Sequence, residues 1–432
     1  MSHASRTGKI EVGKPILVDG FTVRYELKCS PGMRKYFSSR DMFVTYDADM
    51  SDVPEALLLI PFLSSAAPIA WSLGAELRAP CIDVEFLHAL SEIKESFRRF
   101  HPAGDWSGEV RGDLIVDTSR SYRVRRRAIL FSGGVDSVTS AVVHQDENPR
   151  LVTVWGADLG LAQHRPWEQV SAATRTFAQH RSMDISFVKT NFRTFFNSYK
   201  LNARSQPSFP NWYSGFQQGL GLVGLCAPLS CVHELESIYI PSTHTADFAR
   251  PWGSHPEIDN HIRWGSTQAI HDGYELSRQN KLQALAKYIR EEDPGLSLRV
   301  CWAKGANCSR CEKCSITMIG LVIEGLDPNH HGFIFGPQTL SYIRSQLENG
   351  GFNVSHTLVW ILKEIQQTAY PRSHGIEESG CDEFLSWLRG VSVESFRERR
   401  GHSVRKSVTR FLENRPEPLG RTLRKAIGHP FP

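Results

Sequence analysis

The sequence predicts an α/β protein whose core is a parallel sheet with helices on both faces. Short apolar runs of strand length alternate with helical stretches through the middle of the 432-residue chain, a pattern that is typical of parallel sheets. The expected strands are 128–131, 151–155, 185–188, 237–240 and 298–301, and the expected helices are 138–146, 166–180, 214–228 and 280–291. The apolar content of 41% is enough for more than one core. We expect domains at 1–120, 121–328 and 329–432.

The N-terminal domain, residues 1–120, is expected to be a mixed α+β domain. Alternating apolar side chains predict strands in Ile10–Leu27 and Met42–Asp49. Leu57–Ala75 is apolar but is interrupted by two prolines and several serines, so we expect a buried core element rather than a membrane span. The apolar face of Val84–Phe100 predicts an amphipathic helix.

The C-terminal part, residues 329–432, is expected to be a helical extension. Apolar faces within 340–347, 357–367 and 381–388 predict three helices. From Arg389 the tail is rich in arginine and lysine, interleaved with glutamate. A solvated helix face is the default interpretation, and contact with nucleic acid or an acidic partner is the alternative. The net charge of +4 does not by itself indicate a polyanionic partner.

A glycine turn is the most informative motif of the predicted core. The run Ser-Gly-Gly-Val-Asp-Ser lies between an apolar strand and an apolar helix. Gly133 and Gly134 let the backbone approach a ligand closely, and the N–H groups that open the following helix suit pyrophosphate. Asp136 can hold the turn or a magnesium ion. The predicted nucleotide-binding residues are Ser132, Gly133, Gly134, Val135, Asp136 and Ser137. A purely structural strand–helix junction is the alternative.

A second motif places four cysteines in one short segment. Cys301, Cys308, Cys311 and Cys314 offer four thiolates, and a loop containing glycine separates the first two. Zinc prefers four tetrahedral ligands of this kind. Disulfides, free buried thiols and an iron–sulfur cluster are the alternatives. Nothing near the N-terminus has the apolar core of a secretion signal, which argues against disulfides. We therefore predict a structural zinc site at these four residues.

Together, and in this order, the two motifs resemble those of the 7-cyano-7-deazaguanine synthases, the QueC family of PP-loop ATP pyrophosphatases. That family has a Ser-Gly-Gly-x-Asp-Ser loop and a C-x8-C-x2-C-x2-C zinc segment; here six residues separate the first two cysteines. The resemblance covers residues 128–325, under half of the chain. The whole layout resembles the enlarged, QatC-type proteins of bacterial anti-phage operons. It implies a Rossmann-like core of the adenine nucleotide alpha hydrolase type.

Further segments match the family in the same order. Asp158 follows the second strand, and the resemblance implies that it contacts the nucleotide. Residues 240–248 resemble the family's Glu-Thr-Asp-Phe loop, with the Glu-Thr altered. Where the family has Pro-Gly-Arg-Asn, this chain has Phe216-Gln217 in place of the Arg-Asn pair. The implied substrate residues are His164, Thr245, Asp247 and Phe248.

The resemblance implies an ATP-dependent activation of a carboxylic acid, with ATP, Mg²⁺ and Zn²⁺ as cofactors. A carboxylate is a poor electrophile, so its attack on the α-phosphorus of ATP forms an acyl-adenylate and releases pyrophosphate. We expect Asp136 and Lys281 to act at the phosphates. We expect Asp247 to accept hydrogen bonds from a 7-deazaguanine ring. The alternatives are a solvated Lys281 in the first turn of a helix and an Asp247 that caps its own loop.

The leading function is therefore a carbon–nitrogen ligase that adenylates 7-carboxy-7-deazaguanine within an anti-phage defence system. Ammonia or a partner protein from the same operon would supply the amine. The alternatives are a tRNA-modifying enzyme that uses the same ATP chemistry and a non-catalytic scaffold of a defence complex. Without a secretion signal or a predicted membrane span, we expect a cytoplasmic protein with no membrane partner.

Overall fold

The chain divides into two compact units, residues 1–306 and residues 307–432. A computed structural model describes residues 8–203, 211–248, 250–301, 304–368 and 380–397. The basic tail predicted from Arg389 lies outside the described residues beyond position 397. The domain limits expected from the sequence stay a prediction.

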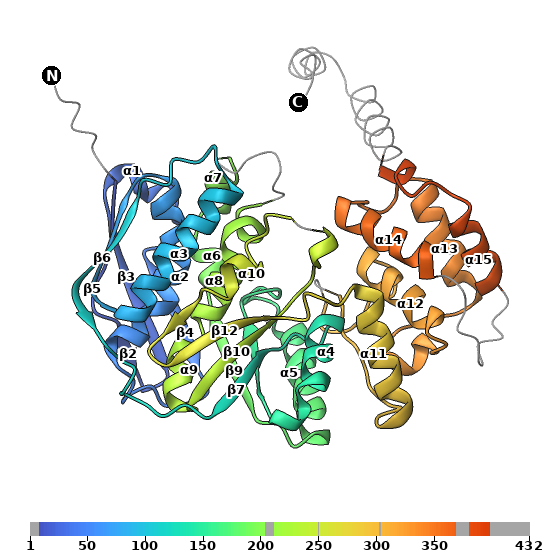
Figure 1. The fold of residues 1–432 in the computed structure, drawn as a ribbon, viewed down its shortest axis with the longest axis horizontal. Helices are drawn as coiled ribbons and strands as arrows, with labels where there is room; N and C mark the ends of the chain where they lie inside the picture. Colours follow the sequence, from blue (N-terminus) through green and yellow to red (C-terminus); the bar gives the residue numbers. More distant parts are fainter. Residues whose placement is uncertain (1–7, 204–210, 249, 302–303, 369–379, 398–432) are drawn as a thin grey trace, which may run out of the picture. The chain divides into compact units, whose positions relative to one another are not determined.

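A 12-stranded mixed sheet runs through the described part of the first unit (Figure 1). Its order is β11-β12-β10-β7-β8-β9-β4-β3-β1-β5-β6, and β2 pairs with β3 outside this path. The first strand in this order, β11, spans Arg263–Trp264. The central five strands are parallel. They are β12 (Thr267–Asp272), β10 (Leu235–Pro241), β7 (Arg126–Leu130), β8 (Arg150–Trp155) and β9 (Ile185–Thr190). The α/β class is confirmed, with a sheet that is compatible with a Rossmann-like core.

The predicted strands at 128–131, 151–155, 185–188 and 237–240 are confirmed, whereas the one at 298–301 is wrong. The backbone N–H of Arg299 donates to the carbonyl oxygen of Gly133 at 2.7 Å, so this segment bonds to the glycine turn instead of extending the sheet. On the side away from β7, β10 pairs with β12, whose sequence, Thr-Gln-Ala-Ile-His-Asp, lacks the apolar run of a buried strand.

The strands of the N-terminal segment extend the same sheet. β4 pairs antiparallel with β9, with Val44 opposite Thr190. The other strands of this segment are β1 (Lys9–Val12), β2 (Ile16–Val18), β3 (Thr22–Cys29), β5 (Glu76–Asp83) and β6 (Glu109–Val116), and β4 spans Asp41–Tyr46. The predicted amphipathic helix is confirmed as α3 (Val84–Phe100). The N-terminal segment and the parallel strands therefore share one continuous hydrophobic core.

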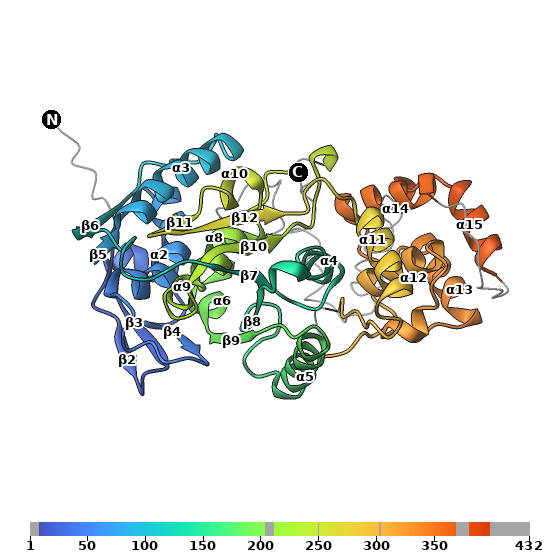
Figure 2. The ribbon, with the colours of Figure 1, turned by 60° about the horizontal axis from the view of Figure 1, so that its bottom comes forward.

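Helices cover both faces of the parallel strands (Figures 1 and 2). One face carries α4 (Val135–Val143) and α5 (His164–His180), and α11 (Arg278–Glu291) packs on α4. The other face carries α6 (Phe192–Phe195), α8 (Gln218–Gly224) and α9 (Ala227–Val232). The helix expected at 214–228 is thus divided, and a π-helical turn at Tyr213–Gln217 precedes α8. Shorter helices are α1 (Pro31–Arg34), α7 (Ser198–Asn202) and α10 (Pro256–Asp259).

The apolar helix α2 (Glu55–Ser72) lies between the N-terminal strands and the core helices. It packs on β5 on one side and on α8 and α9 on the other, so nearly all of its surface is buried. Two described segments, Glu55–Ser72 and Tyr213–Val232, are long and apolar enough to cross a membrane, but 89% and 78% of them is buried within the protein. Their hydrophobicity is accounted for by core packing.

The second unit is helical in its described residues. Its helices are α12 (Glu312–Ile323), α13 (Pro337–Glu348), α14 (His356–Thr368) and α15 (Cys381–Arg389) (Figure 1). The last three correspond to the helices predicted from apolar faces. Their buried side chains, such as Ile343 on α13 and Leu362 on α14, form the core of this unit.

Candidate functional site

The glycine turn joins the end of β7 to the start of α4, at the carboxyl edge of the parallel strands. Gly133 has a φ of +77°, which glycine adopts without strain. The N–H of Ser132 donates to Ser137 Oγ at 3.2 Å, and the N–H of Gly134 donates to Ser132 Oγ at 3.4 Å. Val135 opens α4, whose first-turn N–H groups have no acceptor within the helix. The turn therefore has the features of an anion-binding site.

Arg299 ties this turn to the segment that leads into the cysteines. Its guanidinium donates to the carbonyl oxygens of Ser132 at 3.0 Å and of Cys301 at 2.9 Å. Burial lowers the pKa of Arg299, and the negative charge of Asp158 opposes that effect. Asp158 itself is exposed. Sequence reasoning missed Arg299 because its acceptors are backbone carbonyls, which leave no signature in residue types.

Asp136, in the first turn of α4, is paired with two cations from α11. Lys281 Nζ lies 3.3 Å from Asp136 Oδ1 and also donates to the carbonyl oxygen of Ser242. Arg278 Nη1 lies 3.9 Å from Asp136 Oδ2. The Lys281 side chain is only 3% exposed, which excludes the alternative of a solvated residue. Two cations beside an anion-binding turn can stabilise phosphate charge.

Asp272 links the end of β12 to α4, and the sequence analysis did not single it out. It accepts hydrogen bonds from Ser140 Oγ and from His144 Nε2, the latter at 3.0 Å. The bond to Asp272 raises the pKa of His144, and a second bond to Glu147 acts in the same direction. The His144 ring also stacks on Tyr239 at 4.1 Å between centroids. No local signal marks it, because Asp272 is the last residue of a strand that lacks an apolar run.

The loop after β10 contains three of the predicted substrate residues, Thr245, Asp247 and Phe248, together with His244, which was not predicted to contact the substrate. His244 and Thr245 are buried, Phe248 is half-buried and Asp247 is exposed. The rings of His244 and Phe248 lie 5.6 Å apart. Burial lowers the pKa of His244 to about 4, so its imidazole is neutral at neutral pH. This loop offers both neutral hydrogen-bonding groups and ring surfaces.

The other residues that the motif resemblance singles out lie outside segment 240–248. His164 begins α5, is exposed and meets the ring of Trp155 edge-on at 5.2 Å. Phe216 and Gln217 are buried. Phe216 stacks on Trp212 at 4.5 Å, and Gln217 donates to a backbone carbonyl at 3.4 Å. Phe216 and Gln217 are therefore part of the core.

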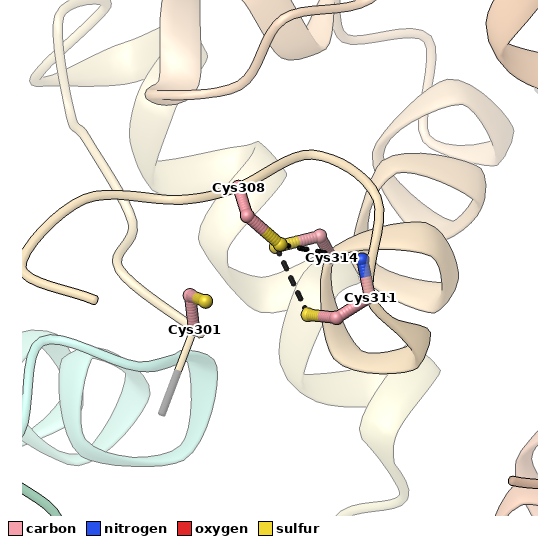
Figure 3. A group of neighbouring side chains, drawn as sticks. All are labelled: Cys301, Cys308, Cys311 and Cys314. Carbon is pink, nitrogen blue, oxygen red and sulfur yellow. Dashed lines mark hydrogen bonds between the residues drawn. The ribbon is translucent and has the colours of Figure 1, made fainter. Parts of the chain in front are cut away.

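The four predicted metal ligands gather into one cluster (Figure 3). The sulfurs of Cys301, Cys308, Cys311 and Cys314 all lie within 4.8 Å of one another. Cys308 and Cys314 are 3.8 Å apart, and Cys311 and Cys314 are 3.5 Å apart. Four sulfurs about 2.3 Å from a tetrahedral ion would be about 3.8 Å from one another, whereas a disulfide needs about 2.05 Å. The cluster can therefore hold a metal ion such as zinc.

In comparisons with protein-family models, with curated proteins and with solved structures, nothing matches this chain. Its class is therefore defined by the structure itself. It is an α/β protein with a mostly parallel mixed sheet, a glycine turn at the sheet's carboxyl edge and a four-cysteine cluster. The resemblance to the QueC family stays a prediction that rests on the motifs.

Proposed function

We propose that this protein is an ATP-dependent enzyme that adenylates a 7-deazaguanine-type carboxylic acid and transfers the acyl group to an amine. The observation that carries the proposal is the glycine turn before α4, with the buried Lys281 and Arg278 on its first-turn carboxylate, Asp136. Such an arrangement suits a polyphosphate, because N–H dipoles and two fixed cations face the same place. The motif resemblance to the QueC family supplies the class of acid.

In the first step, a carboxylate oxygen of the acid attacks the α-phosphorus of ATP. An oxygen–phosphorus bond forms, the bond to the bridging oxygen breaks, and its electron pair leaves with pyrophosphate. The growing negative charge on pyrophosphate is stabilised by the N–H groups of the turn and by Lys281 and Arg278. Asp136 is the carboxylate that suits Mg²⁺ here, and the ion would neutralise phosphate charge.

In the second step, an amine attacks the acyl carbon and AMP leaves. The exposed Asp247 is the proposed acceptor for the ring N–H and exocyclic amine of the deazaguanine. Ammonia, or an amine of a partner protein, is the proposed nucleophile. Zinc at Cys301, Cys308, Cys311 and Cys314 would be structural: four protein ligands leave no open position for a substrate, so it would hold the segment in shape.

The test is pyrophosphate release from ATP and Mg²⁺ with 7-carboxy-7-deazaguanine, with and without ammonia. We expect release that depends on the acid, and Asp136→Ala should lower it by roughly 10²-fold or more. The matched control is Asp146→Ala, which removes an exposed carboxylate and should keep wild-type activity. Release that is independent of the acid, or equal in both variants, would refute the proposal. Mass spectrometry of a co-incubated partner protein would detect the acyl group if the amine belongs to a protein.

A further inference from the structure

A buried histidine–aspartate pair lies at the carboxyl end of β12. His271 Nδ1 is 2.7 Å from Asp259 Oδ2, and the two side chains are 2% and 0% exposed. Ser254 Oγ donates to the same carboxylate oxygen at 2.7 Å. The backbone N–H of His271 donates to Asn260 Oδ1 at 2.7 Å. The imidazole is therefore fixed in one orientation, with Nδ1 directed at a carboxylate.

The other ring nitrogen of His271 has no such partner. Among the described residues, His271 Nε2 makes no hydrogen bond, and neither does the hydroxyl of Thr245 in the loop after β10. Both residues are more than nine-tenths buried. A buried polar group left unsatisfied costs about 1–3 kcal/mol, and such groups are uncommon in folded proteins. One of them is near the end of β12 and the other is in the loop after the adjacent strand, β10, and together they indicate a place for a polar ligand.

This pair is continuous with the proposed nucleotide site. His271 pairs with Ile240 of β10, so it lies at the level where the loop containing His244 begins. The pKa of His244 responds to the charges of Asp136, Lys281 and His271, after the larger effects of burial and Arg250. The backbone N–H of Ser242 donates to the carbonyl oxygen of Asp272, the residue after His271, at 2.8 Å, and Lys281 donates to the carbonyl oxygen of Ser242. The loop after β10 therefore connects the Asp136–Lys281 contact with the end of β12. Tyr274 covers His271 with its ring, 5.4 Å away between centroids.

We propose that His271 is the general base for the acceptor amine, with Asp259 as its positioning residue. This inference rests on the proposed function and deepens it. The adenylation step needs no base, because its nucleophile is an ionised carboxylate. Amide formation does release a proton. A neutral imidazole whose Nδ1–H donates to a carboxylate presents a lone pair at Nε2, which is the arrangement a base requires.

The amine nitrogen forms a bond to the acyl carbon of the adenylate, and its proton moves to His271 Nε2. The bond between the acyl carbon and the phosphate oxygen breaks, and its electron pair leaves with AMP. The imidazolium that results is stabilised by the Asp259 carboxylate at 2.7 Å. The proton then passes to solvent or buffer before the next turnover.

The experiment separates the two half-reactions in His271→Asn, whose side-chain amide can keep the hydrogen bond to Asp259 while Nε2 is lost. Adenylation is measured as pyrophosphate–ATP exchange with 7-carboxy-7-deazaguanine and no amine. Amide formation is measured with ammonia. Hydroxylamine is the rescue nucleophile, since it is largely uncharged at neutral pH and can attack as the free amine without first losing a proton to His271. His233→Asn is the matched control. This histidine contacts the Ser186 hydroxyl and lies outside the proposed site.

We expect His271→Asn to lose ammonia-dependent amide formation by roughly 10²- to 10⁴-fold. The rates of pyrophosphate–ATP exchange and of hydroxamate formation in His271→Asn should stay close to those of the wild type. Asp259→Asn should lose ammonia-dependent amide formation alone, and by a smaller factor than His271→Asn. Unchanged amide formation in His271→Asn would overturn the inference, and so would an equal loss of exchange. Wild-type protein without exchange would instead refute the proposed function on which the inference rests.

Discussion

The buried contact between Lys281 and Asp136 predicts a measurable coupling energy. Two unit charges 3.3 Å apart attract each other by about 5 kcal/mol at an effective dielectric constant of about 20. Desolvation of both groups opposes this attraction. Arg278, 3.9 Å from the same carboxylate, keeps part of the charge balanced when Lys281 is replaced. A double-mutant cycle of Lys281→Met and Asp136→Asn should therefore give a coupling of about 1–3 kcal/mol.

The assay is urea denaturation of the wild type, the two single variants and the double variant, compared as differences in the free energy of unfolding. The control cycle uses Arg78 and Asp113, which are 2.6 Å apart but have side chains 53% and 49% exposed. For that exposed pair we expect less than about 1 kcal/mol. If the two cycles gave the same coupling, burial would not be what strengthens the Lys281 contact, and the reasoning would fail.

Three further perturbations follow from the structure. His144→Gln should lower the melting temperature more at about pH 6 than at about pH 9. The bond to Asp272 raises the pKa of His144, so the stability that this bond contributes is present below the pKa of the unfolded state and is lost as the pH rises through the pKa of the folded state. A difference in melting temperature that does not depend on pH would contradict this. Cys311→Ser should abolish stoichiometric zinc in elemental analysis, and a chelator should lower the melting temperature of the wild type alone. Gly224→Ala should lower the free energy of unfolding, measured by urea denaturation, by about 1–3 kcal/mol, because the new Cβ would lie 2.1 Å from a buried serine hydroxyl of α2. Gly13→Ala is the control: a Cβ there would have nothing within 4 Å, so its free energy of unfolding should stay within about 0.5 kcal/mol of the wild type.

Most of the helices and strands that could be predicted are recognisable from local sequence patterns. The helix at Val84–Phe100 is recovered because its apolar positions recur along one face and Asp83 caps its start by accepting from the Phe86 N–H. The glycine turn and the cysteine segment were visible for the same reason, since each is a short run whose residue types define its chemistry. Segment 298–301 was misjudged because Leu298 and Val300 alternate like a strand, while its hydrogen bonds go to the glycine turn.

What the sequence could not supply were contacts between distant residues. Nothing local to Val44 or Thr190 indicates that these residues pair across the sheet. Arg278 was not singled out beside Lys281, because its pairing with Asp136 depends on how α11 packs on α4. His271 was missed because it is an isolated histidine in a strand, and its significance appears only beside Asp259.

The N-terminal segment accounts for the apolar residue at position 216. Phe216 packs against Phe97 of α3 at 5.6 Å, and against His101 at 4.5 Å and Trp106 at 5.9 Å. An arginine at this position would be buried among aromatic rings, and an unpaired buried charge is strongly unfavourable. Because the N-terminal segment covers the turn that contains Phe216, this position needs an apolar residue. Because β4 also pairs with β9 and the N-terminal strands share a hydrophobic core with the parallel strands, the N-terminal segment is part of the fold that positions the glycine turn.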